Sequence, residues 1–161
     1  QPPEEQQSSS AEQSQNQPLA EQKSEVQSAP DFTLTDLGGD AVSLSDFKGK
    51  NIYLNFWASW CGPCKLEMPD LEKIYQEFKD KDLIVLAVNI GENKSKVETF
   101  VNNNGYSFPI LLDIQGKTAQ TYKVSSIPVS IFINKEGSIV EKRKGLITYR
   151  EMEAYISELL K

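Results

Sequence analysis

The chain has 161 residues, a formal net charge of −6 and no histidine, and this length suits one hydrophobic core with an appendage. The lack of histidine excludes imidazole acid–base catalysis and histidine-containing metal sites. An acidic chain without a basic stripe has little to gain from counterion release, so nucleic acid is not expected as a partner.

The first 30 residues are expected to be a disordered polar tail, and residues 31–161 a single folded domain. Residues 1–30 hold eight Gln, six Ser and five Glu, with Leu19 and Val26 as their only large aliphatic side chains. Such a segment cannot bury enough apolar surface to offset the entropy of ordering it. Because the chain starts at Gln1, we expect a mature form whose signal peptide or membrane anchor was removed, with the tail as a tether. An ordinary disordered terminus is the alternative.

The folded part is expected to alternate strands with helices, after an opening hairpin around Gly38-Gly39. The hairpin strands are 32–34 and 42–44, and the later strands are 52–57, 83–90, 109–112, 129–133 and 138–141. Helical periodicity covers 64–79, 95–104, 118–122 and the C-terminal segment after Thr148. Two capping boxes are expected at helix starts, Ser95 with Glu98 and Thr148 with Glu151. This order predicts a layered α/β domain with a central, mostly parallel sheet, to which the closing hairpin adds antiparallel strands.

The two cysteines, Cys61 and Cys64, stand where a buried strand gives way to a helix. The unpaired N–H groups of a first helical turn carry partial positive charge and stabilise a thiolate, so Cys61 is predicted to be the nucleophile. Cys64 lies one turn further in and is predicted to resolve the mixed disulfide. Pro63 suits the first turn, and Gly62 allows a substrate backbone to come close. An inert stapling disulfide is the alternative.

The segment Trp57-Ala58-Ser59-Trp60-Cys61-Gly62-Pro63-Cys64-Lys65 resembles the active site of thioredoxins. Together with Ala29-Pro30-Asp31-Phe32 before the hairpin, Glu67-Met68-Pro69 after the cysteines and the extra helix at 95–104, it is similar to the TlpA/ResA family of extracytoplasmic thioredoxin-like proteins. The resemblance covers residues 29–161. It implies a thioredoxin-like fold with a mixed sheet, an N-terminal hairpin and a central helical insertion.

The same resemblance implies a protein anchored to the outer face of a bacterial membrane that reduces disulfides, in cytochrome c maturation or a related pathway. The expected partners are proteins with disulfides or thiols, such as apocytochrome c, and an upstream membrane electron donor. The domain is expected to act as a monomer whose redox group is the Cys61–Cys64 disulfide, without a bound cofactor or metal. The resemblance also implies a cis peptide between Ile127 and Pro128, facing the cysteines, with the Ile127 backbone binding a substrate peptide.

Glu67 falls on the apolar stripe of the helix that follows the cysteines, three residues after Cys64. Burial would raise the pKa of this carboxyl group and suit it to exchange a proton with Cys64. Thioredoxins place a buried Asp in the preceding strand, where this chain has Asn55, and asparagine cannot carry the proton. The alternative is that Glu67 extends to solvent at the edge of the stripe.

Trp60 is expected either to cover the disulfide and form part of a docking surface or to be ordinary packing. Lys65 is expected to be a solvated lysine. A thiol peroxidase is disfavoured, because Leu54 and Ala58 occupy the positions where peroxiredoxins have Pro and Thr or Ser. A disulfide-donating oxidase remains open, because the direction of electron flow depends on the reduction potential. A third alternative is a binding or chaperone module that keeps only the fold.

Overall fold

The computed structural model describes residues 26–161, so the tail expected at 1–25 lies outside the described residues. In the described part, seven strands form one sheet in the order β2-β1-β5-β4-β3-β6-β7. The strands are β1 (Thr33–Asp36), β2 (Ala41–Ser43), β3 (Asn51–Trp57), β4 (Leu83–Ile90), β5 (Ile110–Asp113), β6 (Val129–Ile133) and β7 (Ile139–Lys144). The helices are the 3-10 turn η1 (Leu44–Phe47), α1 (Gly62–Phe78), α2 (Lys94–Asn104), α3 (Lys117–Thr121) and α4 (Tyr149–Leu159). The predicted α/β class is confirmed.

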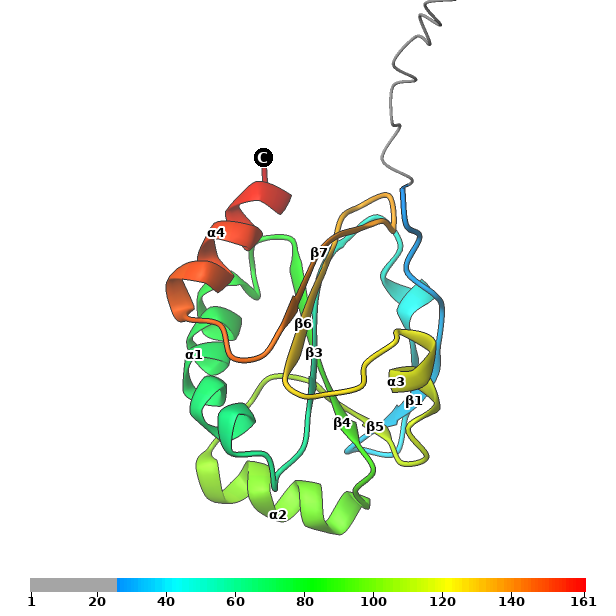
Figure 1. The fold of residues 1–161 in the computed structure, drawn as a ribbon, viewed down its shortest axis with the longest axis vertical. Helices are drawn as coiled ribbons and strands as arrows, with labels where there is room; N and C mark the ends of the chain where they lie inside the picture. The colour runs from blue at the N-terminus through cyan, green and yellow to red at the C-terminus, as the bar shows by residue number, and fades with distance from the viewer. Residues whose placement is uncertain (1–25) are drawn as a thin grey trace, which may run out of the picture.

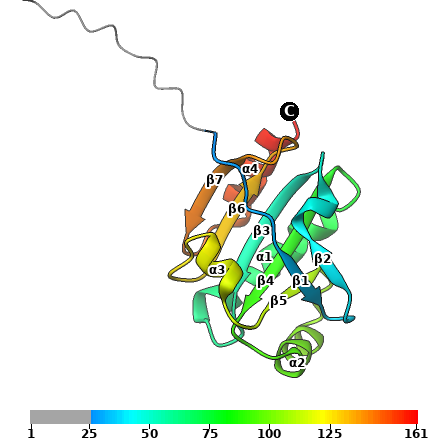
Figure 2. The same cartoon turned by 90° about the vertical axis from the view of Figure 1, so that its right-hand side faces the viewer.

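Helices cover both faces of the sheet, and α2 lies at one end of it (Figures 1 and 2). Side chains of α1, α2 and α4 pack with one face in the larger core cluster, whereas η1 and α3 contribute to the cluster on the other face. Every residue of β3 is buried, as expected for a strand in the middle of such a sandwich. Within residues 26–161, no helix combines the length and the apolar character that crossing a bilayer requires.

The sheet is mixed, as the resemblance implied, whereas the mostly parallel sheet expected from the order of elements was wrong. Only the β3–β4 and β4–β5 pairs are parallel, whereas β1–β2, β1–β5, β3–β6 and β6–β7 are antiparallel. The connection after β5 contains only α3, whose five residues span about 7.5 Å. After α3 the chain enters β6 at the edge of the sheet where β3 and β5 end, so β6 runs antiparallel to β3.

Residues 26–30 belong to the fold rather than to the disordered tail that their composition suggested. The backbone N–H of Ala29 donates to the carbonyl oxygen of Gly137 at 2.9 Å, and the hydroxyl of Tyr122 donates to the carbonyl oxygen of Pro30 at 2.5 Å. The backbone of this segment is thus held by the β6–β7 turn and by the Tyr122 side chain, and composition does not reveal such contacts.

One of the two expected capping boxes is present and the other is not. Thr148 and Glu151 form the predicted box at the start of α4. Helix α2 starts two residues earlier than an N-cap at Ser95 would place it, because Asn93 is the N-cap and its side chain accepts a hydrogen bond from the N–H of Lys96 at 2.9 Å. Asparagine and serine cap about equally well, so the local sequence did not decide between them.

The apolar stripe of α1 lies against the sheet as its spacing predicted, with Cys64, Met68 and Leu71 almost without exposed surface. Tyr75 is only half-buried at the edge of the same cluster. The stripe therefore holds the second cysteine at the sheet, and the packing of α1 is expected to contribute much of the stability of the site.

Leu71→Ala is expected to lower the free energy of unfolding by about 2–5 kcal/mol, because it leaves a cavity in the core. Urea unfolding followed by circular dichroism measures this loss. Leu66→Ala is the matched control, since Leu66 lies on the same helix and is 72% exposed whereas Leu71 is 0% exposed. The control is expected to change stability by less than about 0.5 kcal/mol, and equal losses in both variants would contradict this account of the core.

Candidate active site

The two cysteines lie where β3 ends and α1 begins. Cys61 is the N-cap of α1, and its Sγ accepts a hydrogen bond from the backbone N–H of Cys64 at 3.2 Å. The two residues form a disulfide, with their Cα atoms 5.2 Å apart. The sequence predicted this position at a helix N-terminus, where unpaired N–H groups favour negative charge on the sulfur. Cys61 is 4% exposed and Cys64 1%, so Cys61 is the slightly more exposed of the two cysteines.

The loop before β6 faces the cysteines from the other side of β3. The Ile127–Pro128 peptide bond is cis, as the resemblance implied, and Sγ of Cys61 lies 3.7 Å from the carbonyl oxygen of Ile127. The carbonyl oxygen of Pro128 accepts a hydrogen bond from the N–H of Gly145 at 2.8 Å, which anchors the loop. Because β6 runs antiparallel to β3, its first residue lies beside the last residues of β3, and the loop before it lies at the edge of the sheet that carries Cys61.

Glu67 is buried, so the alternative of a side chain extended to solvent is wrong. Its exposed fraction is 2%. One carboxylate oxygen accepts from the amide of Asn55 at 2.7 Å, and the other accepts from the backbone N–H of Ile147 at 2.9 Å. Asn55, which stands where thioredoxins have a buried aspartate, thus contacts the carboxylate of Glu67.

Burial raises the pKa of Glu67 to about 7, although the hydrogen bonds from Ile147 and Asn55 act in the opposite direction and favour the ionised form. Loss of hydration outweighs these two bonds because a charge in a low-dielectric site is costly. The group therefore exchanges its proton near neutral pH, where a carboxyl group on the surface would be fully ionised.

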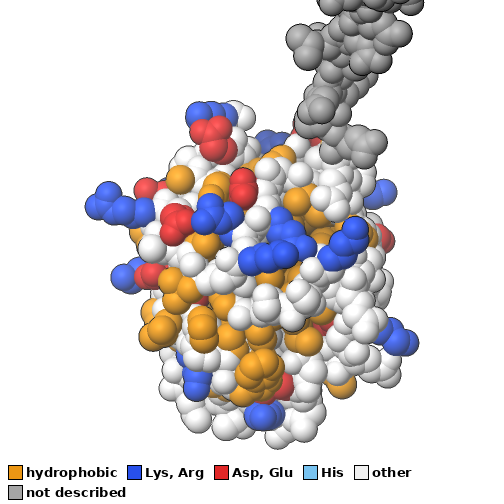
Figure 3. All heavy atoms as spheres, viewed as in Figure 1, with side chains coloured by type: hydrophobic (Ala, Val, Ile, Leu, Met, Phe, Trp, Pro, Cys, Tyr) orange, Lys and Arg blue, Asp and Glu red, His pale blue; other side chains and the backbone are white. Residues whose placement is uncertain are grey.

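Apolar side chains gather on the surface over the first turns of α1 and the loop that precedes α4 (Figure 3). Trp60 is 66% exposed and Leu146 45%, so most of the Trp60 side chain is open to a docking partner, which favours a docking surface over ordinary packing. Gly62 and Pro63 are also exposed, and a methyl group added at Gly62 would meet open space. Lys65 is exposed, as expected. Exposed apolar side chains around a reactive centre are suited to docking another protein.

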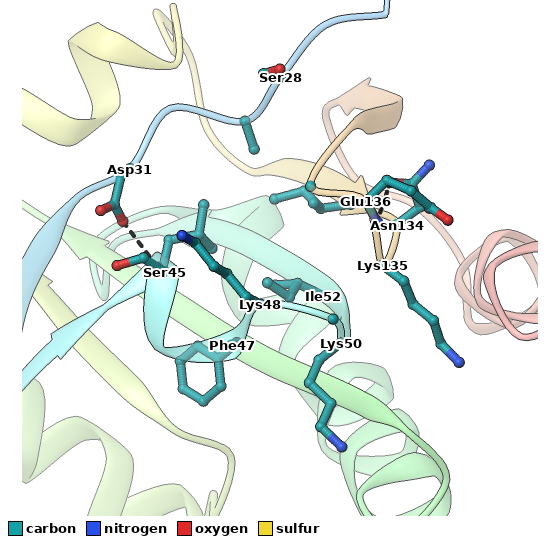
Figure 4. Close-up of a pocket in the computed structure, with 15 residues that line it drawn as sticks. Ser28, Asp31, Ser45, Phe47, Lys48, Lys50, Ile52, Asn134, Lys135 and Glu136 are labelled. Carbon is teal, nitrogen blue, oxygen red and sulfur yellow. Dashed lines mark hydrogen bonds between the residues drawn. The ribbon is translucent and has the colours of Figure 1, made fainter.

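A cavity of about 460 Å³ lies beside this surface, lined by Trp60, Ile127 and Ser126 among others. Another cavity, of about 500 Å³, lies at the opposite end of β3, between Lys50 and the β6–β7 turn (Figure 4). Two of its charged groups, Lys50 and Lys135, pair with Asp82. Of these two cavities, the one beside Trp60 lies next to the disulfide, because Ile127 lines it and its carbonyl oxygen lies 3.7 Å from Sγ of Cys61.

Two contributors to the site were missed from the sequence. The backbone N–H of Ile147 acts through its position alone and leaves no signal in the side-chain pattern. Glu92 accepts hydrogen bonds from Ser59, two residues before Cys61. The sequence did offer a signal for Glu92, because this residue follows β4. Parallel neighbouring strands end at the same edge of a sheet, so a residue after β4 is expected near the residues that follow β3. Among residues 26–161, no cluster of three His, Cys, Asp or Glu side chains is arranged to hold a metal ion.

The AhpC/TSA family model matches residues 26–142. The chain is similar to the thiol-disulfide oxidoreductase ResA of Bacillus subtilis (strain 168), with 40% identity over 134 residues that make up 83% of this chain and 75% of that protein. The solved exposed lipoprotein thioredoxin of Streptococcus pneumoniae is similar with a TM-score of 0.73 and 35% identity, covering 81% of this chain and 100% of that chain. StoA from Bacillus subtilis gives a TM-score of 0.71 at 30% identity, covering 80% and 97%.

Proposed function

The chain belongs to the AhpC/TSA family and is a thiol-disulfide oxidoreductase of the ResA type, and from this premise we propose that it reduces disulfides of proteins outside the cytoplasm. The observation that carries the proposal is the Cys61–Cys64 disulfide at the start of α1, beside the exposed Trp60. Gly62 and Pro63 between the cysteines favour reduction over oxidation, because they match the reducing thioredoxins. Leu54 and Ala58 argue against a thiol peroxidase, because peroxiredoxins have Pro and Thr or Ser at these two positions.

In the forward reaction, the thiolate of Cys61 attacks one sulfur of a substrate disulfide. A Cys61–substrate disulfide forms, and the other substrate sulfur leaves as a thiolate that takes up a proton. The sulfur of Cys64 then loses its proton and attacks Sγ of Cys61, which closes the Cys61–Cys64 disulfide and releases the second substrate thiol. The substrate gains two electrons from the enzyme sulfurs and two protons, one equal to that released by Cys64 and one from solvent, while the enzyme is oxidised to the disulfide. The two sulfurs carry the electron pair, so no bound cofactor is needed.

We assign Glu67 the proton of the second step. Cys64 is 1% exposed and Glu67 2%, so the resolving thiol has little access to water, and the carboxyl group is one helical turn away on α1. A carboxyl group whose pKa is about 7 accepts a proton from a thiol and returns it at neutral pH. Asn55 and Ile147 hold the carboxylate in place through their hydrogen bonds. Asn55 is thus a positioning residue for Glu67.

The substrate peptide is proposed to lie along the Ile127–Pro128 loop, with the backbone of Ile127 as its hydrogen-bonding edge and Trp60, Gly62 and Pro63 beneath it. The proximity of the Ile127 carbonyl to Sγ of Cys61, 3.7 Å, supports this placement. All of these groups come from one chain, so a monomer suffices for the reaction.

The proposed location is the outer face of a bacterial cytoplasmic membrane, with an anchor attached to the N-terminal tail. A similar structure is that of an exposed lipoprotein, which supports this location. Each turnover leaves the Cys61–Cys64 disulfide, so an upstream dithiol, proposed to be a membrane protein, has to reduce it. Apocytochrome c is the proposed substrate, and its support is the resemblance to the TlpA/ResA family.

The direction of electron flow is tested by equilibrating the protein with reduced and oxidised glutathione and measuring the fraction of reduced Cys61–Cys64. We expect a reduction potential near the value of about −270 mV found for thioredoxin, and far from the value of about −120 mV found for DsbA. The double variant Cys61→Ser, Cys64→Ser is the control for adventitious thiol signals. A potential close to −120 mV would instead support the disulfide-donating oxidase.

A further inference from the structure

The carboxylate of Glu92, at the start of the β4–α2 connection, is bound to the segment that leads into Cys61. One oxygen accepts from the backbone N–H of Ser59 at 2.6 Å, and the other accepts from the hydroxyl of the same serine at 2.5 Å. The first oxygen also accepts from the amide of Asn89 at 3.0 Å. Thirty-three residues separate Ser59 and Glu92 in the chain, so this is a tertiary contact.

Glu92 is held as an anion. Its side chain is 3% exposed, and Nζ of Lys96 lies 3.4 Å from the oxygen that binds the Ser59 hydroxyl. Burial opposes ionisation, but the hydrogen bonds from Ser59 and Asn89 and the contact with Lys96 outweigh it and lower the pKa of Glu92. Glu92 also precedes the N-terminus of α2, whose dipole favours negative charge at this end.

The proposed chemistry makes no use of the buried carboxylate of Glu92. Two of the hydrogen-bond donors to this carboxylate nevertheless belong to Ser59, two residues before Cys61. The segment from Ala58 to Cys61 links β3 to α1 and carries the exposed Trp60. The backbone of this segment makes one hydrogen bond within itself, from the N–H of Cys61 to the carbonyl oxygen of Ala58 at 3.2 Å, and one to α1, from the N–H of Lys65 to the carbonyl oxygen of Cys61 at 3.1 Å. Among the described residues, the hydrogen bonds to Glu92 are the ones that hold Ser59 to a part of the chain far away in sequence.

We propose that Glu92 is a positioning residue that fixes the Ser59–Cys61 segment, and that the β4–α2 connection thereby sets the placement of the nucleophile and of Trp60. The inference rests on the disulfide exchange assigned above, and not on the direction of electron flow or on the partner. The proposal gives the helical insertion α2 a role. Lys96 and the N-terminus of α2 hold the carboxylate of Glu92, and this carboxylate in turn holds the Ser59–Cys61 segment.

The test compares Glu92→Ala with Glu72→Ala in the full chain. Glu72 is a matched control, because its carboxylate accepts from the backbone N–H and the hydroxyl of Ser107 in the same way and is not part of the proposed site. We expect Glu92→Ala to lower the second-order rate constant for reducing a disulfide-bonded peptide by about tenfold or more, since a misplacement of about 1 Å can cost roughly 10²-fold. Glu72→Ala is expected to stay within about twofold of the wild type at equal fractions of folded protein.

A second readout does not depend on activity. Trp60 is 66% exposed and Trp57 0%, so quenching of tryptophan fluorescence by acrylamide reports mainly on Trp60. The quenching constant is expected to change in Glu92→Ala and not in Glu72→Ala. Glu92→Gln can keep one bond to the Ser59 N–H and donate to its hydroxyl, so it is expected to restore both the rate and the quenching.

Three results would overturn the proposal: a wild-type rate and quenching constant in Glu92→Ala, equal losses in the Glu92 and Glu72 variants, or a Gln variant as impaired as the Ala variant. If Glu92→Ala does not fold, the Ser59→Ala variant tests the proposal instead, because it removes only the hydroxyl donor to Glu92. This variant is expected to slow disulfide exchange and to change the quenching constant of Trp60. A wild-type rate and a wild-type quenching constant in Ser59→Ala would reject the proposal. An inactive wild type would reject the proposed function, while the quenching comparison would still decide the role of Glu92.

Discussion

Cys61→Ser is expected to abolish disulfide reduction, lowering the rate by about three orders of magnitude or more, because no other sulfur of the chain can begin the reaction. Cys64 is the only other cysteine, and it is 1% exposed, so it cannot reach a substrate disulfide without rearrangement of α1. The measurement is the reduction of a disulfide-bonded peptide with a dithiol as electron source. Retention of more than a tenth of the wild-type rate would mean that Cys61 is not the nucleophile.

Cys64→Ser separates the two steps of the same reaction. Cys61 still attacks the substrate, but no resolving thiol follows, so the mixed disulfide is expected to accumulate to nearly one equivalent. Mass spectrometry of the trapped complex, isolated from cells that carry the variant, names the partner protein. The double variant Cys61→Ser, Cys64→Ser must trap nothing. Trapping by Cys61→Ser instead of Cys64→Ser would reverse the two roles.

Glu67→Gln is expected to slow exchange by about 10- to 100-fold, because a positioned acid or base contributes about 10²–10⁴-fold to a proton-transfer step. The wild-type rate is also expected to show a titration near pH 7, the pKa of Glu67, which the Gln variant lacks. Glu98→Gln is the control, since it removes an exposed carboxylate from α2. Equal rates and pH profiles in the wild type and in Glu67→Gln would show that the proton moves by another route.

The same carboxyl group is expected to make the stability of the domain depend on pH. Its pKa is about 7 in the folded protein against 4.5 in the unfolded chain, so between these values the folded state holds more protons. The free energy of unfolding therefore falls as pH rises from 4.5 to 7, by an amount on the order of 3 kcal/mol. Glu67→Gln is expected to lack this slope while keeping the fold, because the amide of Asn55 can turn to present its oxygen.

Urea unfolding at pH 4.5, 6 and 7.5 measures this dependence in the oxidised protein. The Glu67→Gln variant is expected to lose less stability than the wild type across this range, and Glu98→Gln is expected to follow the wild type. A wild-type stability that rises between pH 4.5 and 7 would mean that the folded protein holds Glu67 ionised throughout.

The reactive centre could be predicted from the sequence because its physics is local. Two cysteines one helical turn apart, after a buried strand and at a helix start, specify both the chemistry and the order of attack. The position of Glu67 on the stripe of Cys64 and Leu71 likewise follows from the period of a single helix. The burial of Glu67 could not be predicted in this way. Whether a side chain lies at the edge or at the centre of an apolar stripe depends on what packs against it, which here is Asn55 and the loop at Ile147.

The neighbours of the strands could not be predicted in the same way. The hydrophobic pattern identifies β1 and β6 as strands, but it does not state that β1 pairs with β5 or that β6 pairs with β3. Those pairings depend on the path of each connection between strands, and the hydrophobic pattern does not specify that path. The antiparallel direction of β6 then places Pro128 opposite the cysteines.

By itself the sequence determined the α/β class, nearly all elements and the sulfur chemistry of Cys61 and Cys64, since these depend on residues close together in the chain. Only the tertiary structure decided that the backbone N–H of Ile147 binds Glu67 and that Glu92 binds Ser59. Residues distant in sequence meet only after the whole sheet has formed, and the free energy that selects their contacts comes from packing all the elements together. No local pattern records that selection.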